Sequence, residues 1–227
     1  MSLNYNSEFT DMKKLVDAAY ECGKAIDMPN CVYGNNKVVP SYYYFLAGMC
    51  RLKSLARVLE IGTFKGGSAL AMYYGQISSD DNKTKIVTVD IEARDTHQID
   101  NILEIKKIIG DPLNGVTLNI IINEFGRQPI DLLFLDSTKK GRIVMSQLAT
   151  FCLFLRPRFI ILDDITLNDN MERMWNNLEV QFSKFALNLA KSHPEIRKMA
   201  EINEKVIRHP GFGIIDYEAY QAGLRSK

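Results

Sequence analysis

The sequence predicts an α/β protein whose seven strands form a doubly wound, mostly parallel sheet that closes with a C-terminal antiparallel hairpin. Two observations lead to this expectation. The short β-branched runs are apolar throughout instead of alternating in polarity, which is typical of strands covered on both faces. Segments long enough for crossover helices separate these runs, and this alternation is typical of a parallel sheet with helices on both sides.

Composition limits the class of protein. The 227 residues are enough for one domain with a substantial core. A net charge of +1 argues against a protein that holds nucleic acid mainly by neutralising phosphates. No apolar run approaches the ~20 residues of a membrane span, and residues 1–10 are too polar for a secretory signal. Without either segment we expect a cytoplasmic protein. Three of the four scattered cysteines lie among apolar neighbours and are interpreted as reduced core thiols.

The N-terminal part is expected to be helical. Apolar residues recur at helical spacing from Phe9 to Tyr20 and predict an amphipathic helix, which is compatible with a homodimer. A loop follows at 29–36, and a second, aromatic helix is expected at Ser41–Arg51. We therefore assign residues 1–38 to an N-terminal helical extension and residues 39–227 to the main domain.

The central part supplies five strands and their crossover helices. Leu113–Phe125 is the least clear segment, because its β-branched content would also suit a strand, and the strand–helix alternation favours a helix there. The expected strands are Arg57–Ile61, Ile86–Ile91, Ile105–Gly110, Ile130–Leu135 and Phe159–Leu162, and the expected helices are Gly66–Ile77, Leu113–Phe125 and Arg142–Phe154.

Two further features are expected near the C-terminus. Apolar residues from Met171 to Leu189 form one stripe, which predicts a single long helix packed on the core. Val206–Arg208 and Phe212–Tyr217 flank His209-Pro210-Gly211, and this pattern predicts the closing hairpin.

A glycine-rich turn follows the first strand, from Glu60 through Gly62 and Gly66 to Ser68. Ligands of open α/β sheets bind beyond the carboxyl ends of the strands. The spacing E-x-G-x-x-x-G-G differs from the G-x-G-x-x-G pattern of dinucleotide sites. An acid before the first glycine would repel an anion and attract an ammonium or sulfonium group. The turn therefore favours S-adenosylmethionine over a nicotinamide dinucleotide, with a purely structural turn as the alternative.

Two more acids follow the next strands. Asp90 ends the second strand, where a carboxylate can accept hydrogen bonds from both ribose hydroxyls of a nicotinamide or an adenosyl ligand. Asp111 follows Gly110 at the end of the third strand, where contacts to an adenine would fall. The common register of Glu60, Gly62, Gly66 and Asp90 favours a ligand site over a purely structural turn.

Three carboxylates are expected to meet at the same edge. Asp136 ends the fourth strand, and Asp163 and Asp164 end the fifth. Neighbouring strands lie ~5 Å apart, so these side chains would converge and repel one another unless a cation is present. A hard divalent ion such as Mg²⁺ is the simplest answer. The alternative is that some of them, Asp164 above all, cap the following helices.

Lys139 lies three residues after Asp136. Beside a metal and a sulfonium group its pKa should be lowered, and it could then act as a general base. The alternative is a solvated loop lysine, which is our interpretation of the neighbouring Lys140.

Four segments together resemble the class I S-adenosylmethionine-dependent methyltransferases, whose fold is Rossmann-like. More narrowly, they resemble the metal-dependent O-methyltransferases that act on catechols and caffeoyl-coenzyme A. The resemblance extends from roughly Val39 to Tyr217 and implies that residues 39–227 form a class I methyltransferase domain. The segments are Glu60–Leu70, Val87–Glu92, Leu132–Lys139 and Ile160–Ile165.

The resemblance implies a role for each matching residue. Glu60 would hold the methionine ammonium group, Asp90 the ribose, and Lys139 would be the base. Asp136, Asp163 and Asp164 would bind the metal. Gly62, Thr63, Gly66 and Ser68 would wrap the amino-acid end of the cofactor. Asp111 and Asp136 would also bind the cofactor.

The sequence departs from the narrower family at the third metal ligand, because Asp164 stands where that family commonly has asparagine. An all-aspartate set resembles the sugar O-methyltransferases of antibiotic biosynthesis and the cephalosporin-hydroxylase-like group. Those commonly carry an acid or a histidine shortly after the first ligand, whereas this chain has Ser137-Thr138-Lys139. Catechol-like and sugar-like acceptors therefore both stay open.

The expected function is a Mg²⁺-dependent, in-line methyl transfer from S-adenosylmethionine to a small hydroxylated substrate, a diol that chelates the metal. We expect no nucleic-acid or membrane partner. Three alternatives remain: a metal-independent or nitrogen-directed methyltransferase, a nicotinamide-dependent oxidoreductase, and a non-catalytic module that binds S-adenosylmethionine.

Overall fold

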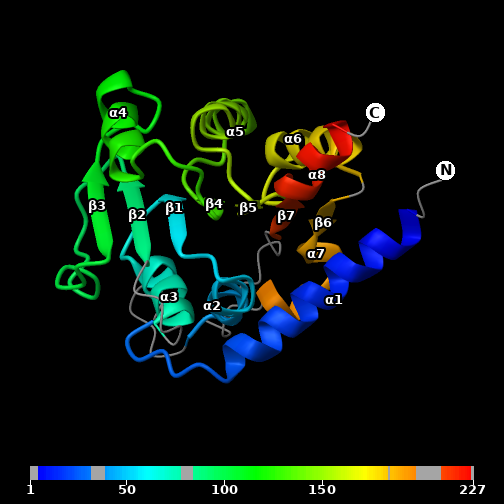
Figure 1. Cartoon of the computed structure of the whole chain (residues 1–227), viewed down its shortest axis with the longest axis horizontal. Coiled ribbons are helices and arrows are strands. Elements are labelled where there is room, and N and C mark those ends of the chain that lie inside the picture. The colour runs from blue at the N-terminus through cyan, green and yellow to red at the C-terminus, as the bar shows by residue number, and fades with distance from the viewer. Residues whose placement is uncertain (1–4, 32–38, 78–83, 184, 198–210, 226–227) are drawn as a thin grey trace.

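The seven strands of the described residues form one sheet in the order β3-β2-β1-β4-β5-β7-β6 (Figure 1). The computed structural model describes residues 5–31, 39–77, 84–183, 185–197 and 211–225. The strands from β1 to β5 pair in parallel, and β7 pairs antiparallel with both β5 and β6. This confirms the predicted fold class. The strands are β1 Arg57–Ile61, β2 Lys85–Asp90, β3 Ile105–Ile109, β4 Leu132–Leu135, β5 Phe159–Leu162, β6 Ala186–Asn188 and β7 Gly213–Asp216.

Helices cover both faces of the sheet (Figure 1). α1, α2, α3 and α7 lie on one side, and α4, α5, α6 and α8 lie on the other. The helices are α1 Tyr5–Lys24, α2 Ser41–Lys53, α3 Gly67–Gln76, α4 Gly115–Glu124, α5 Gly141–Leu155, α6 Asp169–Gln181, α7 Leu189–Ser192 and α8 Tyr217–Arg225, with a 3₁₀ turn at Pro194–Arg197. Among the described helices, none is long and apolar enough to cross a membrane.

The strand side chains alternate between two apolar cores, which explains why the strands are apolar throughout. In β4, Leu132 and Phe134 pack into the core beneath α1–α3. Leu133 and Leu135 pack into the core beneath α4–α6. Since neither face meets water, neither set of alternating positions needs a polar residue.

The predicted N-terminal helix is confirmed as α1, which packs directly on α2. Met12, Val16 and Ala19 form its buried stripe. The two helices approach closely at glycines, since a Cβ on Gly48 would lie 1.7 Å from the carbonyl oxygen of Ala19. The predicted boundary at residue 38 falls in 32–38, outside the described residues, and stays a prediction.

The expectation of a helix at Leu113–Phe125 is also confirmed, as α4. Asn114 caps it, because its side-chain oxygen accepts a 2.9 Å hydrogen bond from the backbone N–H of Val116. Ile121 faces the core, while Val116 is exposed. The β-branched content of this segment therefore belongs to a helix with one buried face.

The single long helix predicted from Met171 to Leu189 is wrong. α6 ends at Gln181, and the chain turns at Phe182 into the short strand β6. β6 pairs with β7, so backbone hydrogen bonds at the sheet edge replace further helical turns.

The closing hairpin is present, but its described arms differ from those expected. The predicted arm Phe212–Tyr217 is confirmed as β7, which pairs antiparallel with β5 and β6. The other predicted arm, Val206–Arg208, and His209 lie outside the described residues.

Candidate cofactor and metal site

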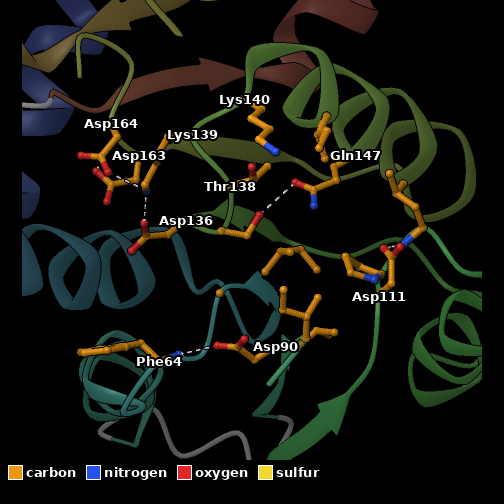
Figure 2. Close-up of a pocket in the computed structure, with 18 of the residues that line it drawn as sticks. Phe64, Asp90, Asp111, Asp136, Thr138, Lys139, Lys140, Gln147, Asp163 and Asp164 are labelled. Atoms are coloured by element: carbon orange, nitrogen blue, oxygen red, sulfur yellow. Dashed lines mark hydrogen bonds and ion pairs between the residues drawn. The ribbon is translucent and has the colours of Figure 1, made fainter. Parts of the chain in front are cut away.

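A cavity of about 700 Å³ lies at the carboxyl ends of β1, β2, β4 and β5. β1 pairs with β2 on one side and with β4 on the other, so the strand order reverses here, and this is where open α/β sheets bind ligands. The fold brings seven of the predicted site residues to the wall of the cavity. They are Gly62 and six residues labelled in Figure 2: Asp90, Asp111, Asp136, Lys139, Asp163 and Asp164.

Asp90, at the end of β2, is held in place by backbone amides. The Phe64 N–H donates a 2.9 Å hydrogen bond to Asp90 Oδ2, and the Glu92 N–H donates one of 3.1 Å to Oδ1. Each carboxylate oxygen keeps a further lone pair for hydroxyl donors in the cavity. The geometry therefore suits a ribose.

Asp111 lies at a different part of the cavity wall (Figure 2). Its Oδ1 accepts a 2.9 Å hydrogen bond from the Leu113 N–H, which fixes the carboxylate. Pro112 and Leu113 provide apolar wall beside it. This combination suits a flat heteroaromatic ring, and its contact with an adenine stays a prediction.

Glu60 is fully buried and does not line the cavity. The Thr88 hydroxyl donates a 2.6 Å hydrogen bond to its Oε2, and the Ser68 hydroxyl donates to its Oε1. Burial raises the pKa of Glu60 to about 7, although these two hydrogen bonds oppose the shift. Thr63, Gly66 and Ser68 are likewise not on the described cavity wall, so the cofactor contacts of these four residues stay predictions.

Position 62 has to be a glycine because of its backbone conformation and the closeness of Asp136. Its φ of +114° is rarely adopted by residues with a side chain. A Cβ at this position would lie 2.1 Å from the carbonyl oxygen of Asp136. The glycine therefore lets the turn after β1 approach the end of β4.

Asp136, Asp163 and Asp164 converge as predicted and form what we call the carboxylate trio. One possible ligand atom from each lies within 4.8 Å of the others. Asp163 and Asp164 are buried, and the Asp164 N–H donates a 2.7 Å hydrogen bond to Asp163 Oδ1. An all-oxygen, anionic donor set of this size fits a hard divalent cation.

Helix capping does not account for the trio. α6 is capped by Asn168, whose Oδ1 accepts hydrogen bonds from the backbone N–H groups of Asn170 and Met171. The N-cap position of α5 is Lys140. Asp164 also has a φ of +58°, which is uncommon for a residue other than glycine and differs from the extended conformation typical of an N-cap residue.

The Lys139 ammonium lies among these carboxylates. Its Nζ is 2.7 Å from Asp136 Oδ1 and 2.6 Å from Asp164 Oδ2. Burial lowers the pKa of Lys139, but the carboxylate charges outweigh burial and raise that pKa well above its usual value. The lowering predicted above applies beside a bound metal ion and a sulfonium group, so it stays a prediction.

Sequence reasoning named neither Arg94 nor Gln147, which also line the cavity, and it favoured a core role over a pocket role for Tyr42, which lines the cavity too. Tyr42 comes from α2, and burial, followed by its neighbour Tyr43 and the nearby carboxylates, raises its pKa well above the usual value, so its hydroxyl stays protonated. The only signal was the run of three tyrosines, which does not say which one faces a site. Trp175 packs in the core, as expected.

No protein-family model matches the sequence, and no curated protein matches it either. Solved structures match its fold. The O-methyltransferase TomG from Streptomyces achromogenes, involved in tomaymycin synthesis and in complex with SAM, has a TM-score of 0.55 at 16% identity over 88% of each chain. The O-methyltransferase from Bacillus cereus in complex with SAH has a TM-score of 0.51 at 18% identity, over 89% of this chain and 90% of that one.

A third similar structure is cofactor-bound Rv0187 from MTB, with a TM-score of 0.53 at 14% identity over 90% of each chain. At these identities the similarity concerns the fold. The chain thus shares the Rossmann-like fold of O-methyltransferases that carry S-adenosylmethionine (SAM) or S-adenosylhomocysteine (SAH).

Proposed function

We propose that the protein is a SAM-dependent O-methyltransferase that uses a divalent metal ion and acts on a small hydroxylated substrate. One observation carries the proposal: a single cavity contains both a carboxylate held for a ribose, that of Asp90, and the carboxylate trio. The fold shared with SAM- and SAH-bound O-methyltransferases supports it.

In this proposal the cofactor lies across the ends of β1, β2 and β4. Asp90 accepts hydrogen bonds from the ribose hydroxyls, and Asp111 lies beside the adenine. The sulfonium group lies towards the negative trio, which attracts it. Glu60 sits beneath the turn, where its bonds to Ser68 and Thr88 hold the backbone that faces the methionine end.

The metal fits the chemistry of the donor set. Asp136, Asp163 and Asp164 would hold it, and vicinal hydroxyls of the acceptor would complete its oxygen ligands. When bound, a divalent ion supplies Lewis acidity, which lowers the pKa of a chelated hydroxyl. The residues of the cavity wall would hold that oxygen in line with the methyl group. Lys139 is the candidate base.

The acceptor we propose is a small diol, catechol-like or sugar-like. The net charge of +1 argues against a protein that holds nucleic acid mainly by neutralising phosphates. Tyr42 keeps a protonated hydroxyl at the cavity wall. A cytoplasmic location and a homodimer remain expectations from the sequence.

A second candidate is a metal-independent methyltransferase, and one observation favours it. The Lys139 ammonium already bridges Asp136 and Asp164, so the trio has a cation within the chain itself. The two candidates differ in their response to a chelator.

The test is SAH formation from SAM with a panel of catechol-like and sugar-like diols, each paired with its mono-hydroxyl analogue, in Mg²⁺ and in EDTA. The proposal expects turnover with a diol that EDTA and Asp163→Asn both abolish. Turnover that survives EDTA would instead support the metal-independent candidate. Binding of SAM without turnover by any acceptor would favour a non-catalytic module.

A further inference from the structure

Lys139 links the two strand ends that carry the trio. Its Nζ contacts Asp136 Oδ1, at the end of β4, and Asp164 Oδ2, beyond the end of β5, at 2.7 and 2.6 Å. Figure 2 shows the side chain reaching in between them. Because three carboxylates repel one another, this ammonium stabilises their close approach.

A divalent ion bound to the trio needs the same position. The possible ligand atoms lie within 4.8 Å of one another, and Mg²⁺ sits ~2.1 Å from each oxygen that it binds. An ion that reaches both strand ends therefore lies between Asp136 and Asp164, where the ammonium is. Two cations in one gap of this size would overlap and repel each other strongly.

The backbone at Lys139 is anchored, so its side chain alone has to move. Asn168 Nδ2 donates a 3.2 Å hydrogen bond to the Lys139 carbonyl. The Gly141 N–H donates a 2.5 Å hydrogen bond to Asn170 Oδ1. Both contacts join the start of α5 to the start of α6. The cavity beside Lys139 offers space into which the side chain can rotate.

Lys140 provides an internal comparison. It lines the same cavity, but Figure 2 shows its side chain pointing away from the trio. Within the described part of the chain, the lysine that forms ion pairs with the trio is Lys139.

We infer that Lys139 and a divalent ion occupy the trio alternately, so that binding of the ion moves the Lys139 ammonium out of the trio and into the cavity. The inference rests on the metal-dependent form of the proposed function. In the ion-free protein Lys139 offsets the carboxylate repulsion. In the ion-bound protein its side chain faces the acceptor.

The first experiment measures Mn²⁺ affinity from the electron paramagnetic resonance signal of free Mn²⁺, without substrate or SAM. We expect Lys139→Met to bind Mn²⁺ about tenfold to a hundredfold more tightly than the wild type. In the variant no ammonium competes with the ion for the carboxylates. Lys140→Met should match the wild type. Lys139→Arg, which keeps a cation, should bind no more tightly than the wild type.

A second measurement uses the wild type alone, in case the Lys139 variants fail to fold. Lysine acetylation by acetic anhydride is followed by peptide mass spectrometry with and without Mg²⁺. Lys139 should be protected without the ion and acetylated several-fold faster with it, while Lys140 should react equally in both conditions. Protection of Lys139 that is unchanged by Mg²⁺ would overturn the exchange.

The outcomes separate this inference from the function beneath it. Equal Mn²⁺ affinity in the wild type and Lys139→Met would overturn the exchange and leave the metal site standing. No Mn²⁺ binding by either protein would overturn both the exchange and the metal-dependent function. SAH binding, measured separately, would then decide whether the methyltransferase proposal survives.

Discussion

The backbone N–H of Phe64 donates a 2.9 Å hydrogen bond to Asp90 Oδ2, which joins the glycine turn after β1 to the end of β2 (Figure 2). The turn and the acid therefore form one unit at the cavity wall. A change at Asp90 should alter the ligand site directly, and the position of the turn as well.

Asp90→Asn should weaken SAH binding about tenfold to a hundredfold, because a hydrogen bond to a charged group contributes about 1.5–3 kcal/mol. Isothermal titration with SAH measures the change. Asp95→Asn is the matched control, since Asp95 is an exposed acid of the loop after β2 that pairs with His97. Unchanged affinity in Asp90→Asn would show that Asp90 does not contact the cofactor.

Glu60 makes stability depend on pH in the direction opposite to that of an ion-paired acid. Its folded pKa of about 7 lies above the ordinary value of 4.5, so the folded state binds its proton more tightly than the unfolded state does. The favourable contribution is complete below pH 4.5 and is lost as the pH rises towards 7. The loss is on the order of 3 kcal/mol.

Glu60→Gln should remove this slope, because glutamine does not titrate. Urea unfolding of both proteins from pH 5 to pH 8 tests it. The free energy of unfolding of the wild type should fall relative to that of the variant as the pH rises. Parallel curves would mean that Glu60 does not titrate in this range.

The imidazole of His193 joins the end of α7 to α1. Its Nε2 lies 2.5 Å from Asp17 Oδ1, and the ring is buried. Asp17→Ala should cost about 1–2 kcal/mol of stability, because it leaves a buried ring nitrogen without its acceptor. Asp11→Ala is the control, since its pair with Lys14 is exposed and should contribute almost nothing. Equal stability of the two variants in denaturant unfolding would refute this role.

Gly62→Ala should lower the free energy of unfolding by roughly 2 kcal/mol or more. The added Cβ meets the Asp136 carbonyl, and the backbone has a positive φ. Gly115→Ala is the matched control, because no atom lies within 4 Å of its added Cβ. Thermal unfolding of both variants tests the prediction. Wild-type stability in Gly62→Ala would mean that the turn after β1 can shift freely.

The sequence was informative where local pattern and topology agree. Leu132–Leu135 is apolar at every position because both faces of β4 are covered, so the run itself identifies a central strand. The placement of Asp136 and Asp163 follows, because adjacent parallel strands end at the same edge.

The missed features depend on contacts between distant segments. Phe182 and Leu189 continue a helical spacing, but β6 exists because β7, far along the chain, offers hydrogen bonds at the sheet edge. The motif places Glu60 before the glycines, but it does not predict that the Glu60 side chain accepts a hydrogen bond from Ser68 beneath the turn. The proximity of Lys139 to Asp136 follows from their spacing, whereas the second ion pair, with Asp164, depends on how the chain folds beyond β5.

The most direct test of the central claim is isothermal titration of the purified protein with SAH, in Mg²⁺ and in EDTA, with NADH as the competing ligand. The account predicts one SAH per chain with micromolar or tighter affinity, which Asp90→Asn weakens, and no heat from NADH. NADH binding without SAH binding would contradict the account and point to a nicotinamide-dependent enzyme.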